Sequence, residues 1–106
     1  MQAGRLRTRF TLEEPVRTPD AGGGATIDWT PLSCLWGAIK PLSRRERSGA
    51  GGRLSEVTHD ITIRHRDGVL PEMRLVHEAR VFHILAVLDD EGGRQLVCHC
   101  REEVRA

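Results

Sequence analysis

Strict alternation of apolar and polar side chains is the feature that most limits how this chain can fold. In residues 56–66, valine and isoleucine fall on one parity together with two histidines, while threonine, aspartate and arginine fill the other. The same two-residue period runs through residues 5–12, where Phe10 and Leu12 alternate with arginines. Because side chains of a β-strand point to opposite faces in turn, both segments are predicted to be strands with one packed face.

Other apolar segments extend this predicted sheet. Residues 25–39 are rich in apolar side chains but contain Pro31, which cannot donate to a ladder inside a central strand, so a kink or bulge is expected there. Residues 80–88 form a nearly continuous apolar run that is too short for a core helix and favours a buried strand. A brief strand around Leu75 and a last strand over residues 94–104 complete the set.

Glycine and proline mark the connections between these segments. Pro15 and Pro19 precede three consecutive glycines, which predicts a long hairpin loop over residues 15–24. Asp67-Gly68 and residues 89–93 are typical of turns. The predicted fold is therefore mostly β: a small antiparallel β-barrel or sandwich of five to six strands with one short helix and long loops. An α+β domain with one short helix across an open sheet is the alternative.

The length of 106 residues suits one domain spanning residues 1–106, since domains cluster at roughly 100–150 residues. A chain this short buries only about 60–65% of its unfolded surface, so part of its apolar surface is expected to contact other subunits. Trp29 and Trp36 are half of the four aromatic residues, and we expect them to dominate the core because each can bury about 150–250 Å².

A basic, glycine-rich loop over residues 43–55 separates the two halves of the chain. Residues 40–53 carry five basic side chains and one acidic, a local charge of +4, and end in small flexible residues. Ser43 could cap a short helical turn with Glu46 three positions later. The loop is either a solvated connection or a segment that orders on assembly and faces a polyanion such as DNA, without the aromatic residues that base stacking needs.

Charge and cysteine content exclude several classes of function. The formal net charge of +1 recommends neither nucleic acid nor a membrane as a partner of the whole molecule. No stretch reads as a signal peptide or an apolar span of about 20 residues, so we expect synthesis in the cytosol. Three cysteines, an odd number, favour reduced thiols over a disulfide framework.

No residue is predicted to be catalytic, to bind a cofactor or to bind a metal. Cys98 and Cys100 would share one face of a strand while His99 points to the other, so two core thiols explain the Cys-His-Cys pattern without zinc. A nucleophile pair of Cys34 with a histidine has no local signature, and the glycines lack the pattern of a phosphate-binding loop. We therefore expect that the protein is not an enzyme.

The order of these features resembles the head-tail joining proteins, also called head completion or stopper proteins, of tailed bacteriophages and phage-like gene transfer agents. The resemblance covers almost the whole chain in the stretches AGRLRTRFTLEEPVRTPDAGGG, DWTPLSCLWGAIKPLSRRE, THDITIRHRDGVLPEMRLVHEARVFHILAV and LVCHCREEV. The second half has fewer aromatic residues than is usual in that family, with Phe82 alone after Trp36. The matching positions are Pro19-Asp20, Trp29, Trp36, Ile39, Pro41-Leu42 and Glu46.

This resemblance implies a small β-barrel in a ring of sixfold or twelvefold symmetry in the neck of a virion or phage-like particle, assembled in the bacterial cytoplasm. The ring would join the portal or adaptor proteins of the capsid to the tail terminator or tail proteins, and would help to retain or gate packaged double-stranded DNA. It implies no cofactor and no membrane. In this reading the DNA channel is lined by Arg44, Arg45, Arg47 and Arg53, and a neighbouring subunit or ring is contacted by Arg5, Arg7 and Arg9.

Three other readings stay open from the residues alone. A tail terminator would cap the tail instead of closing the head. A small OB-like module of the host cell would bind nucleic acid. A metal-dependent enzyme would use Cys34, Cys98 and Cys100.

Overall fold

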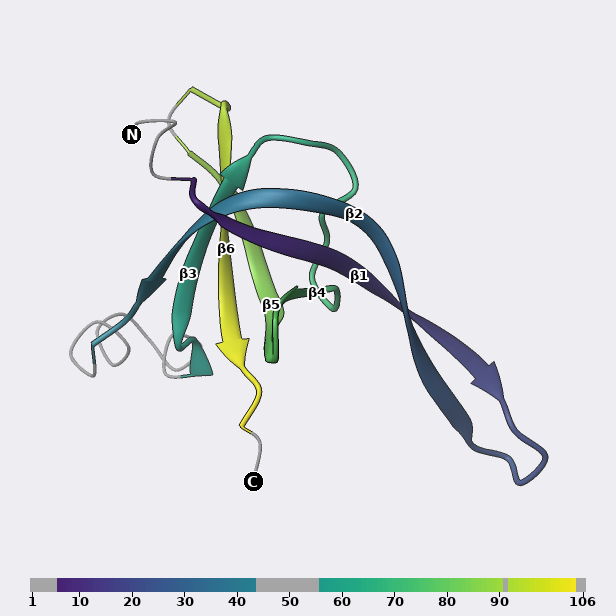
Figure 1. Ribbon diagram of the computed structural model, residues 1–106. Helices are drawn as coiled ribbons and strands as arrows, with labels where there is room; N and C mark the ends of the chain where they lie inside the picture. The colour runs from purple at the N-terminus through teal and green to yellow at the C-terminus, as the bar shows by residue number, and fades with distance from the viewer. Residues whose placement is uncertain (1–5, 44–55, 91, 105–106) are drawn as a thin grey trace.

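Six antiparallel strands form the part of the chain that the computed structural model describes, residues 6–43, 56–90 and 92–104. Hydrogen-bonded neighbours follow the order β1-β2-β3-β6-β5-β4, and β4 pairs again with β1, so the sheet closes into a barrel (Figure 1). This confirms the predicted mostly β fold. The described residues contain no α-helix, and Glu46 of the predicted helical turn lies outside them. The strands are β1 (Thr8–Pro19), β2 (Ala25–Pro41), β3 (His59–Arg64), β4 (Arg74–His77), β5 (Arg80–Asp89) and β6 (Gln95–Glu102).

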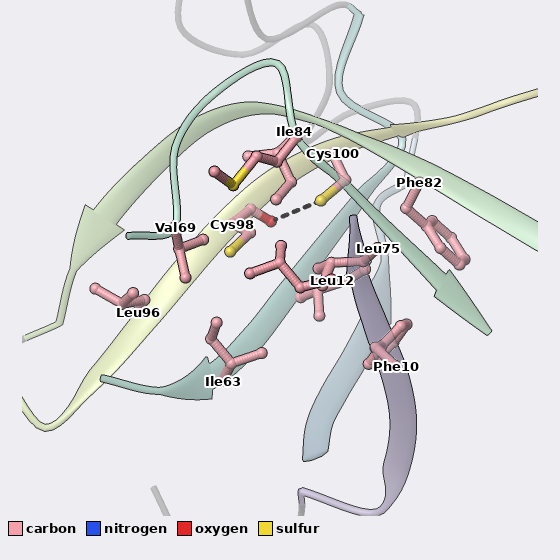
Figure 2. Close-up of a cluster of buried hydrophobic side chains, with 12 residues drawn as sticks. Phe10, Leu12, Ile63, Val69, Leu75, Phe82, Ile84, Leu96, Cys98 and Cys100 are labelled. Carbon is pink, nitrogen blue, oxygen red and sulfur yellow. Dashed lines mark hydrogen bonds between the residues drawn. The ribbon is translucent and has the colours of Figure 1, made fainter. Parts of the chain in front are cut away.

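The core occupies the inside of the barrel and is made by the inward parity of each strand (Figure 2). No polar or charged residue is buried among those described. Two phenylalanine rings, Phe10 and Phe82, meet edge to face with their centroids 6.1 Å apart. Burying a large apolar side chain contributes about 1.5–3 kcal/mol, so this cluster is the main source of stability. Its fully buried members are Phe10, Leu12, Ile61, Ile63, Leu75, Phe82, Ile84, Cys98 and Cys100.

The prediction that the tryptophans dominate the core is wrong. Trp36 is 56% exposed because it shares the outward parity of β2, opposite Arg9 of β1. Trp29 is half-buried on the outer surface, with the guanidinium of Arg74 4.2 Å from its ring centroid and the ring of His83 5.9 Å away. Both parities of β2 carry apolar residues. The parity that packs on the core is the one that does not contain Trp36.

A register shift in the β1–β2 pair confirms the bulge expected near Pro31. Leu12 pairs with Ser33, but the next residue, Glu13, pairs with Pro31, so Leu32 has no partner on β1. An extra residue of this kind bends the strand and increases its twist. The pair therefore changes direction where it leaves the barrel.

Beyond this bulge, β1 and β2 continue as a two-stranded projection (Figure 1), which we call the arm and define as residues 14–30. The predicted loop over residues 15–24 is wrong, because β1 runs to Pro19 and the turn is confined to residues 20–24. The carboxylate of Asp20 holds this turn by accepting hydrogen bonds from the backbone N–H groups of residues 22 and 24 at 2.9 and 3.0 Å. Proline is tolerated here because β1 pairs with β4 only as far as Glu13, which leaves an unpaired edge beyond it.

A bidentate ion pair fastens the end of β6 to β5. Arg80 donates from Nε and Nη2 to the two carboxylate oxygens of Glu102, at 2.8 and 3.0 Å. The guanidinium also lies 4.9 Å from the ring centroid of Phe82, and the ring of His59 lies 5.2 Å from the same ring. The hydrogen bond from Arg80 lowers the pKa of Glu102 below its usual value of 4.5, against a smaller opposing effect of burial.

Replacing Gly37 with alanine tests how tightly the barrel closes at β2. The added Cβ would lie 3.0 Å from Cε2 of Phe10 and 3.1 Å from the carbonyl oxygen of Thr62, which the β2–β3 ladder holds in place. We expect Gly37→Ala to lower the free energy of unfolding by about 1–3 kcal/mol, measured by urea denaturation. The matched control is Gly22→Ala, whose Cβ would meet only a carboxylate oxygen of Asp20 at 3.6 Å. Equal stability of the two variants would contradict this account.

Acid titration tests the Arg80–Glu102 pair. Because the folded-state pKa of Glu102 is lowered, the pair stabilises the fold above pH 4.5, and this contribution is lost as pH falls through the folded-state pKa. Glu102→Gln should lower the unfolding free energy near pH 7 by no more than about 1 kcal/mol, since both side chains are partly solvated. It should also flatten the loss of stability below pH 4.5. Glu14→Gln, which removes a carboxylate from the arm and leaves the Arg80–Glu102 pair intact, is the control variant.

Candidate assembly surface

The outer wall of the barrel carries part of the predicted subunit interface. Arg7 and Arg9 are both exposed, and Arg9 lies on the outward parity of β1, directly opposite Trp36 on β2. Arg5 lies outside the described residues. The wall therefore presents arginine and tryptophan side by side, the two residue types that most often dominate protein interfaces.

A groove of about 270 Å³ opens on this wall beside the exposed tryptophan, and we call it the Trp36 groove. Its cations are Arg64 at the end of β3 and Arg66 in the following loop, and no carboxylate lines it. At the edge of the groove, Oδ1 of Asp89 lies 4.0 Å from Nε2 of His65. The groove is thus aromatic and basic. It is lined by Cys34, Leu35, Trp36, Arg64, His65 and Arg66.

A larger hollow of about 490 Å³ lies on the wall between β2 and β3. It is lined by Ala38 and Val97 together with polar side chains that include Asp60. That carboxylate is already engaged, because Oδ1 of Asp60 lies 2.6 Å from Nδ1 of His99.

A cluster of side chains holds the root of the arm against the barrel. Nε of Arg74 on β4 donates to Oε1 of Glu13 on β1 at 2.6 Å, and both side chains are mostly buried. The same guanidinium stacks on Trp29, and His83, which packs edge to face on that tryptophan, lies 2.8 Å from a carboxylate oxygen of Glu103. Hydrogen bonds, stacking and strand pairing together fix the direction in which the arm leaves the barrel.

The side chains of the arm fall on two faces of different character, because directly paired residues share a face. One face carries Glu14, Val16 and Asp28 with threonines around them, and we call it the acidic face. The opposite face carries Arg17 and Ile27 with two prolines and Trp29 nearer the root. Val16 is 41% exposed and Ile27 48% exposed, so neither face is covered in the single chain.

The thiols have no arrangement suited to catalysis in the described residues. Burial raises the pKa of Cys98 to about 12 and also raises that of Cys100, so both remain protonated at neutral pH. Cys34 is exposed, and no imidazole of a described residue is hydrogen-bonded to its thiol. Across residues 6–43, 56–90 and 92–104, no three histidine, cysteine or acidic side chains form a group that could hold a metal ion. In the part of the chain that the structure describes, no helix is long and apolar enough to cross a membrane.

The sequence prediction and the structure select different residues. Arg44, Arg45, Arg47 and Arg53, the predicted channel residues, lie outside the described residues. The arm and the Trp36 groove were missed, the arm because part of it was predicted to be a loop, and the groove although Trp36 and Arg64 belong to segments correctly predicted as strands. The signal that could have found the groove is the outward parity of Trp36 opposite Arg9, which becomes visible only once the register is known.

The chain is similar to known proteins over nearly its whole length. A family model described as phage head completion protein matches residues 1–103. Among solved structures, the chain is similar to one in the virion of a native gene transfer agent particle, with 36% sequence identity over 96% of this chain and 98% of that one, and a TM-score of 0.74. It is also similar to a Shigella flexneri 2a protein solved in solution, with 28% identity over the full length of both and a TM-score of 0.80. No curated protein matches it.

Proposed function

The chain belongs to the phage head completion protein family, and from this premise we propose that it is a structural virion protein that forms a ring at the head-tail interface. The observation that carries the proposal is the match over residues 1–103 together with the likeness to a chain of a gene transfer agent virion. The ring would connect the portal or adaptor end of the capsid to the tail. Its symmetry would be sixfold or twelvefold, as the resemblance to this family implies, and repeated copies of one head-to-tail contact can close into such a ring.

The surface of the described residues supports assembly with other proteins. Exposed apolar side chains occur on the outer wall, at Trp36 and Leu88, and on the arm, at Ile27. Trp36 and Leu35 line one groove of the outer wall, and exposed apolar surface that is gathered in this way can mark an interaction site. Arg7 and Arg9 are both exposed and Arg9 lies opposite Trp36, which supports our assignment of the N-terminal arginines to contacts with a neighbouring subunit or ring.

The loop over residues 43–55 is proposed to face the DNA channel and to help to retain the packaged genome. Residues 40–53 carry a local charge of +4, while the formal net charge of the whole chain is +1, so positive charge is concentrated in this segment. Arginine side chains neutralise phosphates without reading sequence, as contact with passing double-stranded DNA requires. The role is structural and not catalytic, in keeping with two buried, protonated thiols.

Particles made without this protein test the proposal. We expect heads that fill with DNA and then lose it or fail to take tails, so that gene transfer falls by orders of magnitude while capsid assembly is unchanged. Purified heads that await tails should contain the protein. Its presence in purified tails and absence from heads would identify a tail terminator instead, and normal DNA transfer without the protein would contradict any role in the joint.

The same particles test the loop. Replacing Arg44, Arg45, Arg47 and Arg53 with glutamine should leave the protein in the neck and reduce the fraction of heads that retain DNA. The control variant is Arg17→Gln, which removes one exposed arginine from the arm. DNA retention equal to that of the unaltered protein would exclude contact between these four arginines and DNA.

A further inference from the structure

Two complementary surfaces of this chain cannot meet within one molecule. The acidic face of the arm presents Val16 beside two carboxylates, Glu14 and Asp28. The Trp36 groove presents an aromatic ring beside two guanidinium groups, those of Arg64 and Arg66. No ion pair with a described residue neutralises any of these four charges. One surface is therefore apolar and negative, and the other is apolar and positive.

The fold keeps these surfaces apart. Asp28 and Trp36 lie on the same strand and are separated by roughly 25 Å, since a strand rises about 3.3 Å per residue. Pairing with β1 continues along this stretch, and the hydrogen bond between Arg74 and Glu13 fixes the root of the arm. The arm cannot turn back onto its own groove without breaking the longest strand pair of the barrel.

From this geometry we infer that the arm of one copy docks with its acidic face in the Trp36 groove of the next copy. Glu14 and Asp28 would pair with Arg64 and Arg66, and Val16 would cover the exposed ring of Trp36. Paired opposite charges around an apolar centre give an interface both register and specificity. The inference deepens the proposed function, because it names the contact through which ring subunits would join.

The contact joins two different patches, so it is head-to-tail and can be repeated from copy to copy. Such a contact closes into a ring when the rotation between neighbours closes. A reciprocal exchange of arms between two copies would stop at a dimer. Two other partners are possible: duplex DNA could bind in the basic groove, and another virion protein could bind to the arm. The test must distinguish both from a second copy of this chain.

Disulfide trapping tests the contact with the purified full-length protein, because Cys34 already lines the groove. Cys98 and Cys100 are buried and do not compete. A variant with Val16→Cys and Cys34→Ser is mixed with unaltered protein under mild oxidation. We expect a mixed disulfide dimer between the two proteins, since a disulfide forms only when the two Cα atoms come within about 7 Å. Val16→Cys alone, which carries both thiols, should give a ladder of products beyond the dimer.

The matched control moves the thiol to the other face of the same arm. Ile27→Cys with Cys34→Ser has a similar exposure, 48% against 41% for Val16, but points away from the acidic face. Equal amounts of mixed disulfide from the two variants would overturn the inference. A product of Val16→Cys that stops at the dimer would replace the head-to-tail contact with a reciprocal one.

Charge exchange tests the pairing itself. Arg64→Glu with Arg66→Glu in the Cys34 partner should reduce the mixed disulfide roughly fivefold, the effect of two exposed ion pairs, and Glu14→Arg with Asp28→Arg in the arm variant should restore it. Arg17→Glu on the opposite face of the arm is the control for the change in charge. Unfolding curves confirm that each variant folds.

An unchanged yield after charge reversal would overturn the pairing. If the variant with Arg64→Glu and Arg66→Glu also bound duplex DNA less tightly than the unaltered protein, the groove would be assigned to DNA. The proposed function is tested separately, by particles made without this protein. Those particles could still fail to take tails even if no mixed disulfide forms between two copies of the protein.

Discussion

The pairing of β1 with β2 is the constraint on which the rest of the structure depends. Its inner half places Phe10 and Leu12 in the core and closes the barrel, since β1 also pairs with β4 and β2 with β3. Its outer half has no other strand beside it and becomes the arm. The unpaired residue Leu32 marks the change between the two, and the ion pair of Glu13 with Arg74 fixes the direction of the arm. One strand pair thus both closes the barrel and forms the arm.

Sequence periodicity predicted the core wherever only one parity of a strand is apolar. Phe10 alternates with arginines, and Cys98 and Cys100 flank an outward histidine, so the inward face follows directly. In β2 both parities are apolar, and only pairing with β1 shows that Trp36 points outward. Pro15 was predicted to begin a loop, because the sequence does not reveal that this edge of β1 is not paired with β4. The docking surfaces were missed for a related reason, since they consist of residues brought together across strands.

The distribution of charge connects the structure to the family. A formal net charge of +1 says little about partners, yet the described residues separate an acidic face on the arm from a basic groove on the wall. Such a division suits a subunit whose neighbours include copies of itself. If the proposed function is right, the exposed tryptophan and the projecting arm have a role in assembly with neighbouring subunits.

An image of the particle at subunit resolution tests the central claim most directly, because position and symmetry together define a head-tail joining protein. The account predicts six or twelve copies of the barrel in one ring between capsid and tail, with the arm of each copy seated in the Trp36 groove of the next. The barrel on the capsid shell or at the far end of the tail would contradict the account. So would a ring at the joint whose arms point away from neighbouring copies, which would leave the family assignment intact and remove the contact.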